Sequence, residues 1–160
     1  MTARERFLEL NRLQHHVIEW GEGSEVVVLC HGFLDFAWSF VRVAERLAEA
    51  GFHVVAFDFR GHGETEWIGR GGYYHFPDYT LDLDALVRSL EVERVHLVGH
   101  SMGGTVASMY AGIRPERIRS LVLCEGMGPM PTDLASIPMR FGTWMEGVER
   151  VRRRERRPMA

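Results

Sequence analysis

The stretch RVHLVGHSMGG, residues 94–104, is a run of apolar residues followed by the pattern G-x-S-x-G. The apolar residues predict a buried strand, and the residues after Ser101 are typical of the first turn of a helix. A strand that turns sharply into a helix strains the residue at the turn and brings its neighbours on either side close together. Glycines at positions 99 and 103 avoid the clash that side chains would cause there. We therefore predict a nucleophile elbow that holds the hydroxyl of Ser101 above the edge of a sheet.

Further apolar runs predict more buried strands, over residues 25–30, 52–59 and 118–124. Continuous runs of this kind are typical of strands covered on both faces in a parallel sheet. Apolar residues at helical spacing lie between the strands, over residues 36–50, 77–90 and 102–113. This alternation predicts an α/β fold with right-handed crossovers and helices on the faces of the sheet.

Finer expectations concern the residues around these elements. Residues 6–20 predict a strand hairpin whose turn lies near Asn11. Asp35 is expected to cap the first helix. The residues that would form the apolar face of this helix are Phe36, Phe40, Val43 and Leu47. Cys30 and Cys124 end apolar runs, and we expect both to be reduced thiols buried in strands.

Composition excludes several classes of protein. The chain of 160 residues suits a single core, and its net charge of -3 does not favour nucleic-acid binding. No apolar run approaches the length of a membrane span and no signal segment precedes the first strand, so we expect a cytoplasmic protein with no membrane contact. The arginine-rich residues 152–157 are interpreted as the solvated face of a helix. We expect no metal and no cofactor, because no Cys/His cluster has ligand spacing.

A change of character after Gly126 indicates an internal boundary. Gly128, Pro129 and Pro131 interrupt the pattern, and a helix is expected from Pro138 onward. Its apolar side would carry Phe141, Trp144, Met145, Val148 and Val151. We therefore expect two parts, residues 1–126 and residues 127–160.

A serine that attacks a carbonyl needs hydrogen-bond donors for the oxyanion that forms. The backbone amide of Met102 is one candidate donor because of its position directly after the serine. The second donor should come from a loop at the end of a neighbouring strand, and we predict the amide of Phe33 in the segment His31-Gly32-Phe33. Gly32 would let the backbone approach the substrate closely.

Three motifs together resemble the α/β-hydrolase fold family, in its esterase-like and lipase-like branch. They are HGF at residues 31–33, DFRGHG at residues 58–63 and GHSMGG at residues 99–104. The resemblance implies that residues 1–126 form part of the hydrolase core and that residues 127–160 begin a helical cap. It also implies a structural role for His31 and for residues 58–63, while Gly99, His100 and Gly103 frame the nucleophile Ser101.

The resemblance to this family also implies which type of substrate Ser101 would attack. Haloalkane dehalogenases and epoxide hydrolases of this fold use an aspartate at the nucleophile position, whereas a serine implies attack on an ester-like or other carbonyl substrate. Aromatic residues in the loop and cap regions, Tyr73, Tyr74 and Trp144, imply a small acyl substrate that is partly apolar.

The family's catalytic base is a histidine late in the chain, and no histidine follows His100 here. Glu125, after the strand that ends at Cys124, is a candidate for the catalytic acid, or else a strand-end carboxylate with local partners. We expect a truncated hydrolase that is inactive alone and whose last strand presents an edge for self-association. The alternative is a catalytically dead fragment or a binding module.

Overall fold

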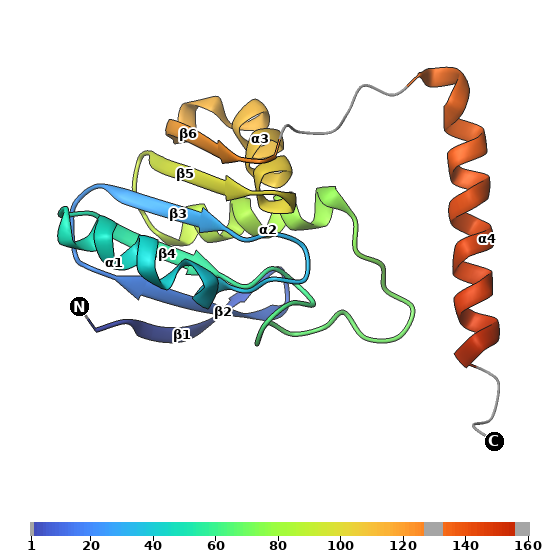
Figure 1. Cartoon of the computed structure of the whole chain (residues 1–160), viewed down its shortest axis with the longest axis horizontal. Coiled ribbons are helices and arrows are strands. Elements are labelled where there is room, and N and C mark those ends of the chain that lie inside the picture. The colour runs from blue at the N-terminus through green and yellow to red at the C-terminus, as the bar shows by residue number, and fades with distance from the viewer. Residues whose placement is uncertain (1, 127–132, 156–160) are drawn as a thin grey trace. The chain divides into compact units, whose positions relative to one another are not determined.

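The computed structural model describes residues 2–126 and 133–155 of the chain. Two compact units are present, Met1–Pro129 and Met130–Ala160. The first holds a six-stranded sheet with helices on both faces (Figure 1). The α/β class and the mostly parallel sheet predicted from the sequence are confirmed. The expected boundary at residues 127–131 and the side chains of residues 152–157 lie outside the described residues.

The sheet has the strand order β1-β2-β4-β3-β5-β6. Its strands are β1 Arg4–Leu10, β2 Leu13–Trp20, β3 Val26–Cys30, β4 His53–Phe57, β5 Val95–His100 and β6 Ile118–Cys124. Strands β4, β3, β5 and β6 run parallel, whereas β2 pairs antiparallel with both β1 and β4. The β1–β2 hairpin turns at Asn11 and Arg12, both with positive φ, as a two-residue turn of this kind requires.

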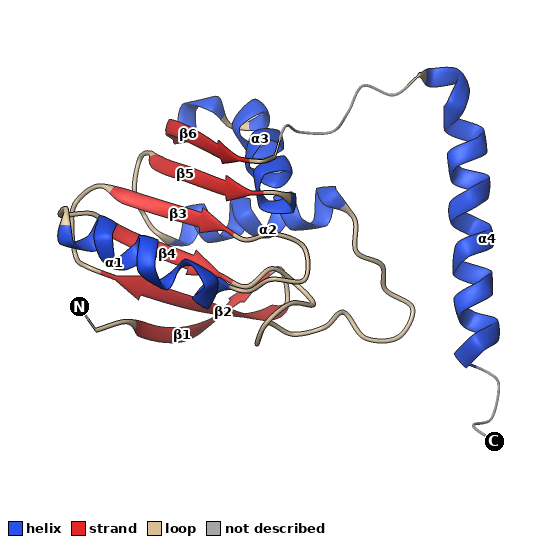
Figure 2. Cartoon of the chain, in the orientation of Figure 1, coloured by secondary structure: helices blue, strands red, loops and turns tan. Residues whose placement is uncertain are grey.

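Helices cover the sheet on both sides (Figure 2). The helices of the first unit are η1 Ala37–Phe40, α1 Val41–Glu49, α2 Phe76–Ser89, α3 Met102–Ile113 and η2 Pro115–Arg117. Alternate strand residues separate the two faces: Val28 packs in the cluster with α2 and α3, while Val27 packs in the cluster with α1. The second unit contains η3 Leu134–Ser136 and α4 Ile137–Glu155.

The expected apolar face of the first helix is confirmed in part, because Phe40 and Leu47 pack against the core while Phe36 and Val43 do not. Ala44 and Ala48 of α1 are buried, whereas Val43 is 49% exposed and Phe36 lies before the helix with 47% exposure. Small side chains let a helix approach a sheet closely, and the large residues then remain at the rim. Asp35 is not the helix N-cap; its carboxylate accepts hydrogen bonds from the Phe36 amide and the Ser39 hydroxyl instead.

The expectation of two buried thiols is wrong for one of them. Cys30 is fully buried in β3, and this burial raises the pKa of its thiol. Cys124 is exposed because it ends β6, which lies at the edge of the sheet. Both cysteines are free.

The outer edge of β6 predicts self-association. Val122 is 50% exposed and, within the described residues, no strand pairs with this edge. An exposed apolar strand edge offers unpaired backbone groups to another chain. We expect a concentration-dependent increase in mass by sedimentation velocity, and Val122→Lys should shift it toward the monomer. The control is Val43→Lys on α1, a valine of nearly equal exposure at 49% that lies away from any strand edge. Equal association of both variants and the wild type would contradict this role for β6.

Candidate active site

Ser101 lies at the junction of β5 and α3 in a strained backbone conformation. Its φ of 50° and ψ of -114° are unfavourable for a residue with a side chain. Two backbone hydrogen bonds hold the residue in place: its amide donates to the Cys124 carbonyl at 2.9 Å, and its carbonyl accepts from the Thr105 amide at 3.1 Å. The serine is therefore fixed between the end of β6 and the first turn of α3.

The glycines around Ser101 have no room for a side chain. A Cβ at Gly99 would lie 2.5 Å from the Gly103 carbonyl oxygen. A Cβ at Gly103 would lie 2.5 Å from the carbonyl carbon of Cys30 and 2.5 Å from the carbonyl oxygen of His31. These neighbours are backbone atoms, so they cannot move aside as a flexible side chain would. Close packing of β3, β5 and α3 thus sets the position of the serine.

The segment after β3 lies directly against this turn. A Cβ at Gly32 would lie 3.5 Å from the Cβ of Ser101 and 3.0 Å from Nδ1 of His100. The next residue, Phe33, follows with a side chain that is 67% exposed. This segment is therefore close to the serine, and Phe33 lines the same pocket as Met102, which begins α3.

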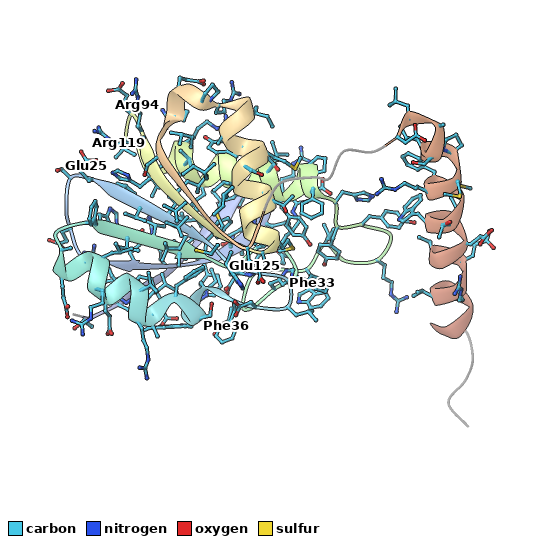
Figure 3. The ribbon with its side chains drawn as sticks, turned by 45° about the horizontal axis from the view of Figure 1, so that its top comes forward. Glu25, Phe33, Phe36, Arg94, Arg119 and Glu125 are labelled. Carbon is cyan, nitrogen blue, oxygen red and sulfur yellow. The ribbon has the colours of Figure 1, made fainter. Side chains whose placement is uncertain are left out.

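An open pocket of about 500 Å³ joins the residues that the sequence singled out. It is lined by Phe33, Tyr74, Phe76, Tyr79, Ser101, Met102, Thr105, Glu125 and Gly126. Figure 3 shows Glu125 and Phe33 at the carboxyl ends of the strands, whereas Glu25 lies at the opposite end of the sheet. The structure thus brings together Ser101, the two candidate oxyanion donors and the candidate acid.

Glu125 follows β6 with a φ of 61°, another positive value for a residue with a side chain. The next residue, Gly126, packs so tightly that a Cβ there would lie 2.5 Å from the carbonyl oxygen of Ser101. This contact fixes the backbone beside Glu125 at the rim of the pocket. Among the described residues, no histidine is hydrogen-bonded to Glu125 or to the hydroxyl of Ser101.

His31 is committed to the scaffold. Its Nδ1–H donates to the Gly32 carbonyl at 2.7 Å, and its Nε2 accepts from the Phe59 amide at 3.0 Å. Burial lowers the pKa of the imidazole, outweighing the opposing hydrogen bond to Gly32. A neutral ring with both nitrogens in use cannot take a proton from Ser101. Its role is to hold the Phe33 loop against β4.

Asp58 organises the loop beneath the site in a way that the sequence did not reveal. Its carboxylate accepts hydrogen bonds from the Ala37 amide at 2.6 Å, the Glu64 amide at 2.9 Å and Nδ1–H of His16 at 2.9 Å. A Cβ at Gly63, whose φ is 50°, would lie 2.6 Å from Oδ1 of Asp58. The sequence gives no indication that His16 is the partner of Asp58. His16 lies 42 residues from Asp58, and no local pattern links the two positions.

Protonation of His16 makes the stability that its contacts provide depend on pH. Desolvation lowers the pKa of His16, but its hydrogen bonds to Asp58 and Glu5 outweigh this, so the pKa is raised. A raised folded-state pKa adds stability that is complete below the unfolded value, roughly 6.5, and is lost as the pH rises through the folded value. We expect thermal melts to show His16→Gln losing more stability at pH 6 than at pH 9. An equal loss at both values would show that His16 is neutral.

Metal sites and membrane-spanning helices are absent from the part of the chain that the structure describes. No group of three His, Cys, Asp or Glu side chains there could hold a metal ion. None of its helices is long and apolar enough to cross a membrane.

A family model and several known proteins that match this chain are all described as hydrolases. The family model described as alpha/beta hydrolase fold matches residues 25–156. A "Serine hydrolase-like protein" of Danio rerio is 36% identical, covering 74% of this chain and 36% of its own length. The 2-hydroxy-6-oxononadienedioate/2-hydroxy-6-oxononatrienedioate hydrolase of Escherichia coli O139:H28 is 32% identical, covering 98% of this chain and 54% of its own.

Solved structures agree with the sequence relatives. The crystal structure of epoxide hydrolase VrEH1 from Vigna radiata superimposes with a TM-score of 0.77 and 34% identity, over 82% of this chain and 42% of that one. The chain thus spans between about a third and about half of the length of the curated relatives just named.

Proposed function

We propose, because the chain belongs to the α/β-hydrolase fold family, that Ser101 is the nucleophile of a serine hydrolase acting on an ester-like or other carbonyl substrate. The observation that carries the proposal is the strained Ser101 turn, with its hydroxyl on a pocket shared with Phe33 and Met102. A serine at this position, rather than the aspartate used by the family's epoxide hydrolases, favours acyl chemistry.

The reaction would begin with attack of the Ser101 oxygen on the carbonyl carbon of the substrate. Negative charge would then develop on the carbonyl oxygen, and we expect the amides of Met102 and Phe33 to donate hydrogen bonds to it. The N-terminus of α3 adds a favourable dipole at the same point. Aromatic residues in the pocket wall, Phe33, Tyr74, Phe76 and Tyr79, suit a partly apolar acyl group.

Deprotonation of the serine is the step for which the described residues provide no base. A neutral serine hydroxyl is a weak nucleophile until a base accepts its proton. We therefore expect this chain alone to position Ser101 without activating it. We assign residues 1–126 to the hydrolase core and residues 127–160, including α4, to the beginning of a helical cap.

Chemical rescue tests the proposal. A fluorophosphonate probe phosphonylates a serine when its oxygen displaces fluoride from phosphorus. Added imidazole accepts the serine proton in place of a histidine side chain. We expect slow labelling of Ser101, accelerated at least tenfold by imidazole and absent in Ser101→Ala, with the site identified by mass spectrometry.

Ser39 provides a matched control. It is exposed and its hydroxyl is hydrogen-bonded to Asp35, but it lacks the strained turn and the oxyanion donors. Ser39→Ala should be labelled like the wild type. If a folded chain shows no labelling of Ser101 even with imidazole, the alternative of a catalytically dead fragment or a binding module is favoured instead.

A further inference from the structure

The described lining of the pocket that contains Ser101 has one charged side chain, that of Glu125. Burial, joined by nearby Tyr74, raises the pKa of Tyr79, so this phenol remains neutral. No arginine, lysine or histidine is among the lining residues that the structure describes.

A cation that interacts with this wall is already paired. Arg60 interacts with Tyr79, but its guanidinium makes two hydrogen bonds of 2.6 Å to the Asp82 carboxylate. A guanidinium held by a buried carboxylate in this way cannot turn toward a ligand. A negatively charged substrate group would therefore meet Glu125 with no counter-charge from the described wall.

The aromatic rings of the pocket wall add a second, independent preference for cations over anions. Phe33, Tyr74 and Phe76 present partly exposed rings to the pocket. The faces of aromatic rings are negative, so they attract cations and repel anions. A ligand that meets the face of one of these rings is therefore subject to the same preference as a ligand beside the Glu125 carboxylate.

We propose that Glu125 is a specificity-determining residue that excludes anionic substrates, so that the Ser101 site takes neutral or cationic acyl compounds. This inference rests on the function proposed above, because it concerns the same pocket. Two like charges about 6 Å apart near a protein surface repel measurably even after screening. We expect a carboxylate-bearing ligand to bind about tenfold more weakly than its neutral isostere.

Binding of three probes of similar size tests the proposal without any turnover. The probes are 4-phenylbutanamide, 4-phenylbutanoate and 4-phenylbutylamine, which share one aromatic group and differ in charge. Dissociation constants come from amide chemical-shift titrations of the chain at pH 7 and low salt. We expect the amine and the amide to bind about tenfold or more tightly than the carboxylate, and Glu125→Gln to reduce that difference below threefold.

Glu93→Gln is the control variant, since Glu93 is an 88% exposed carboxylate that does not line the pocket. It should keep the wild-type order of the probes. Equal binding of amide and carboxylate in the wild type, a difference that survives in Glu125→Gln, or no binding of any probe would each overturn the proposal.

Ser101→Ala separates this inference from the proposed function. The serine hydroxyl is not required for non-covalent binding, so this variant should keep the same order of the probes. Loss of charge selection with intact imidazole-dependent labelling would reject the role of Glu125 alone. Intact charge selection without labelling of Ser101 would reject the nucleophile alone.

Discussion

Gly103→Ala should abolish labelling of Ser101 and lower the free energy of unfolding by about 3 kcal/mol, at the upper end of overpacking costs. The added methyl group would lie 2.5 Å from the carbonyl carbon of Cys30 and from the carbonyl oxygen of His31. To relieve this clash, α3 would have to move away from the end of β3. That movement would separate the Ser101 turn from Gly32 and Phe33, so loss of reactivity should exceed what the loss of stability explains.

Gly112→Ala is the matched control for this prediction, because it makes the same change in the same helix. A Cβ at Gly112 would have no atom within 4 Å. Alanine in an exposed helical position stabilises by roughly 0.5–1 kcal/mol relative to glycine. Urea unfolding followed by circular dichroism, together with probe labelling, measures both effects. A Gly103→Ala chain with wild-type stability and labelling would show that the turn is not tightly packed.

The Ser101 turn could be predicted from the sequence because its causes are local. Strain at one residue and close approach of the residues on either side demand glycines at fixed spacing, and a pattern of this kind is visible in a few letters. The central strands were equally visible, because β3 and most of β4 are buried apolar runs. The sequence also predicted β6 as a buried strand, but this strand lies at the edge of the sheet and is mostly exposed. The resemblance to the α/β-hydrolase family rested on these same local features, and the family match over residues 25–156 confirms it.

The buried polar contacts could not be predicted, because they join residues that are far apart in the chain. Asp82 of α2 accepts a hydrogen bond from Asn11, 71 residues earlier, and His16 reaches Asp58. Nothing near either residue in the sequence indicates its partner. The buried face of α1 was predicted only in part, for a different reason. Apolar spacing identifies a helix but not whether large or small residues face the sheet, and here Ala44 and Ala48 do.

Asp82→Ala should lower the free energy of unfolding by about 3–5 kcal/mol, the usual cost of breaking a buried ion pair. Asp82 is fully buried and pairs with Nε and a terminal nitrogen of Arg60, both at 2.6 Å. It also accepts from Asn11 at the tip of the β1–β2 hairpin, and Nε2 of His15 lies 3.2 Å away. Its loss would leave the buried Arg60 guanidinium with only the more distant Asp78 carboxylate, 3.7 Å away, and would remove the Asn11 hydrogen bond that joins α2 to the hairpin.

The control for Asp82→Ala is Glu49→Ala, which removes the exposed pair between Glu49 and Arg46 and should cost below about 0.5 kcal/mol.

An acid titration adds a second check on Asp82. Desolvation alone would raise the pKa of Asp82, but its hydrogen bonds from Arg60 and Asn11 and the nearby His15 outweigh it and hold the pKa below its ordinary value. A lowered folded-state pKa adds stability above the unfolded value, roughly 3.9, that is lost as the pH falls through the folded value. The stability difference between wild type and Asp82→Ala should therefore be full at pH 6 and should shrink only below about pH 4. If the difference were already lost at pH 6, Asp82 would be protonated in the folded chain, and the pair with Arg60 could not be the source of its stability.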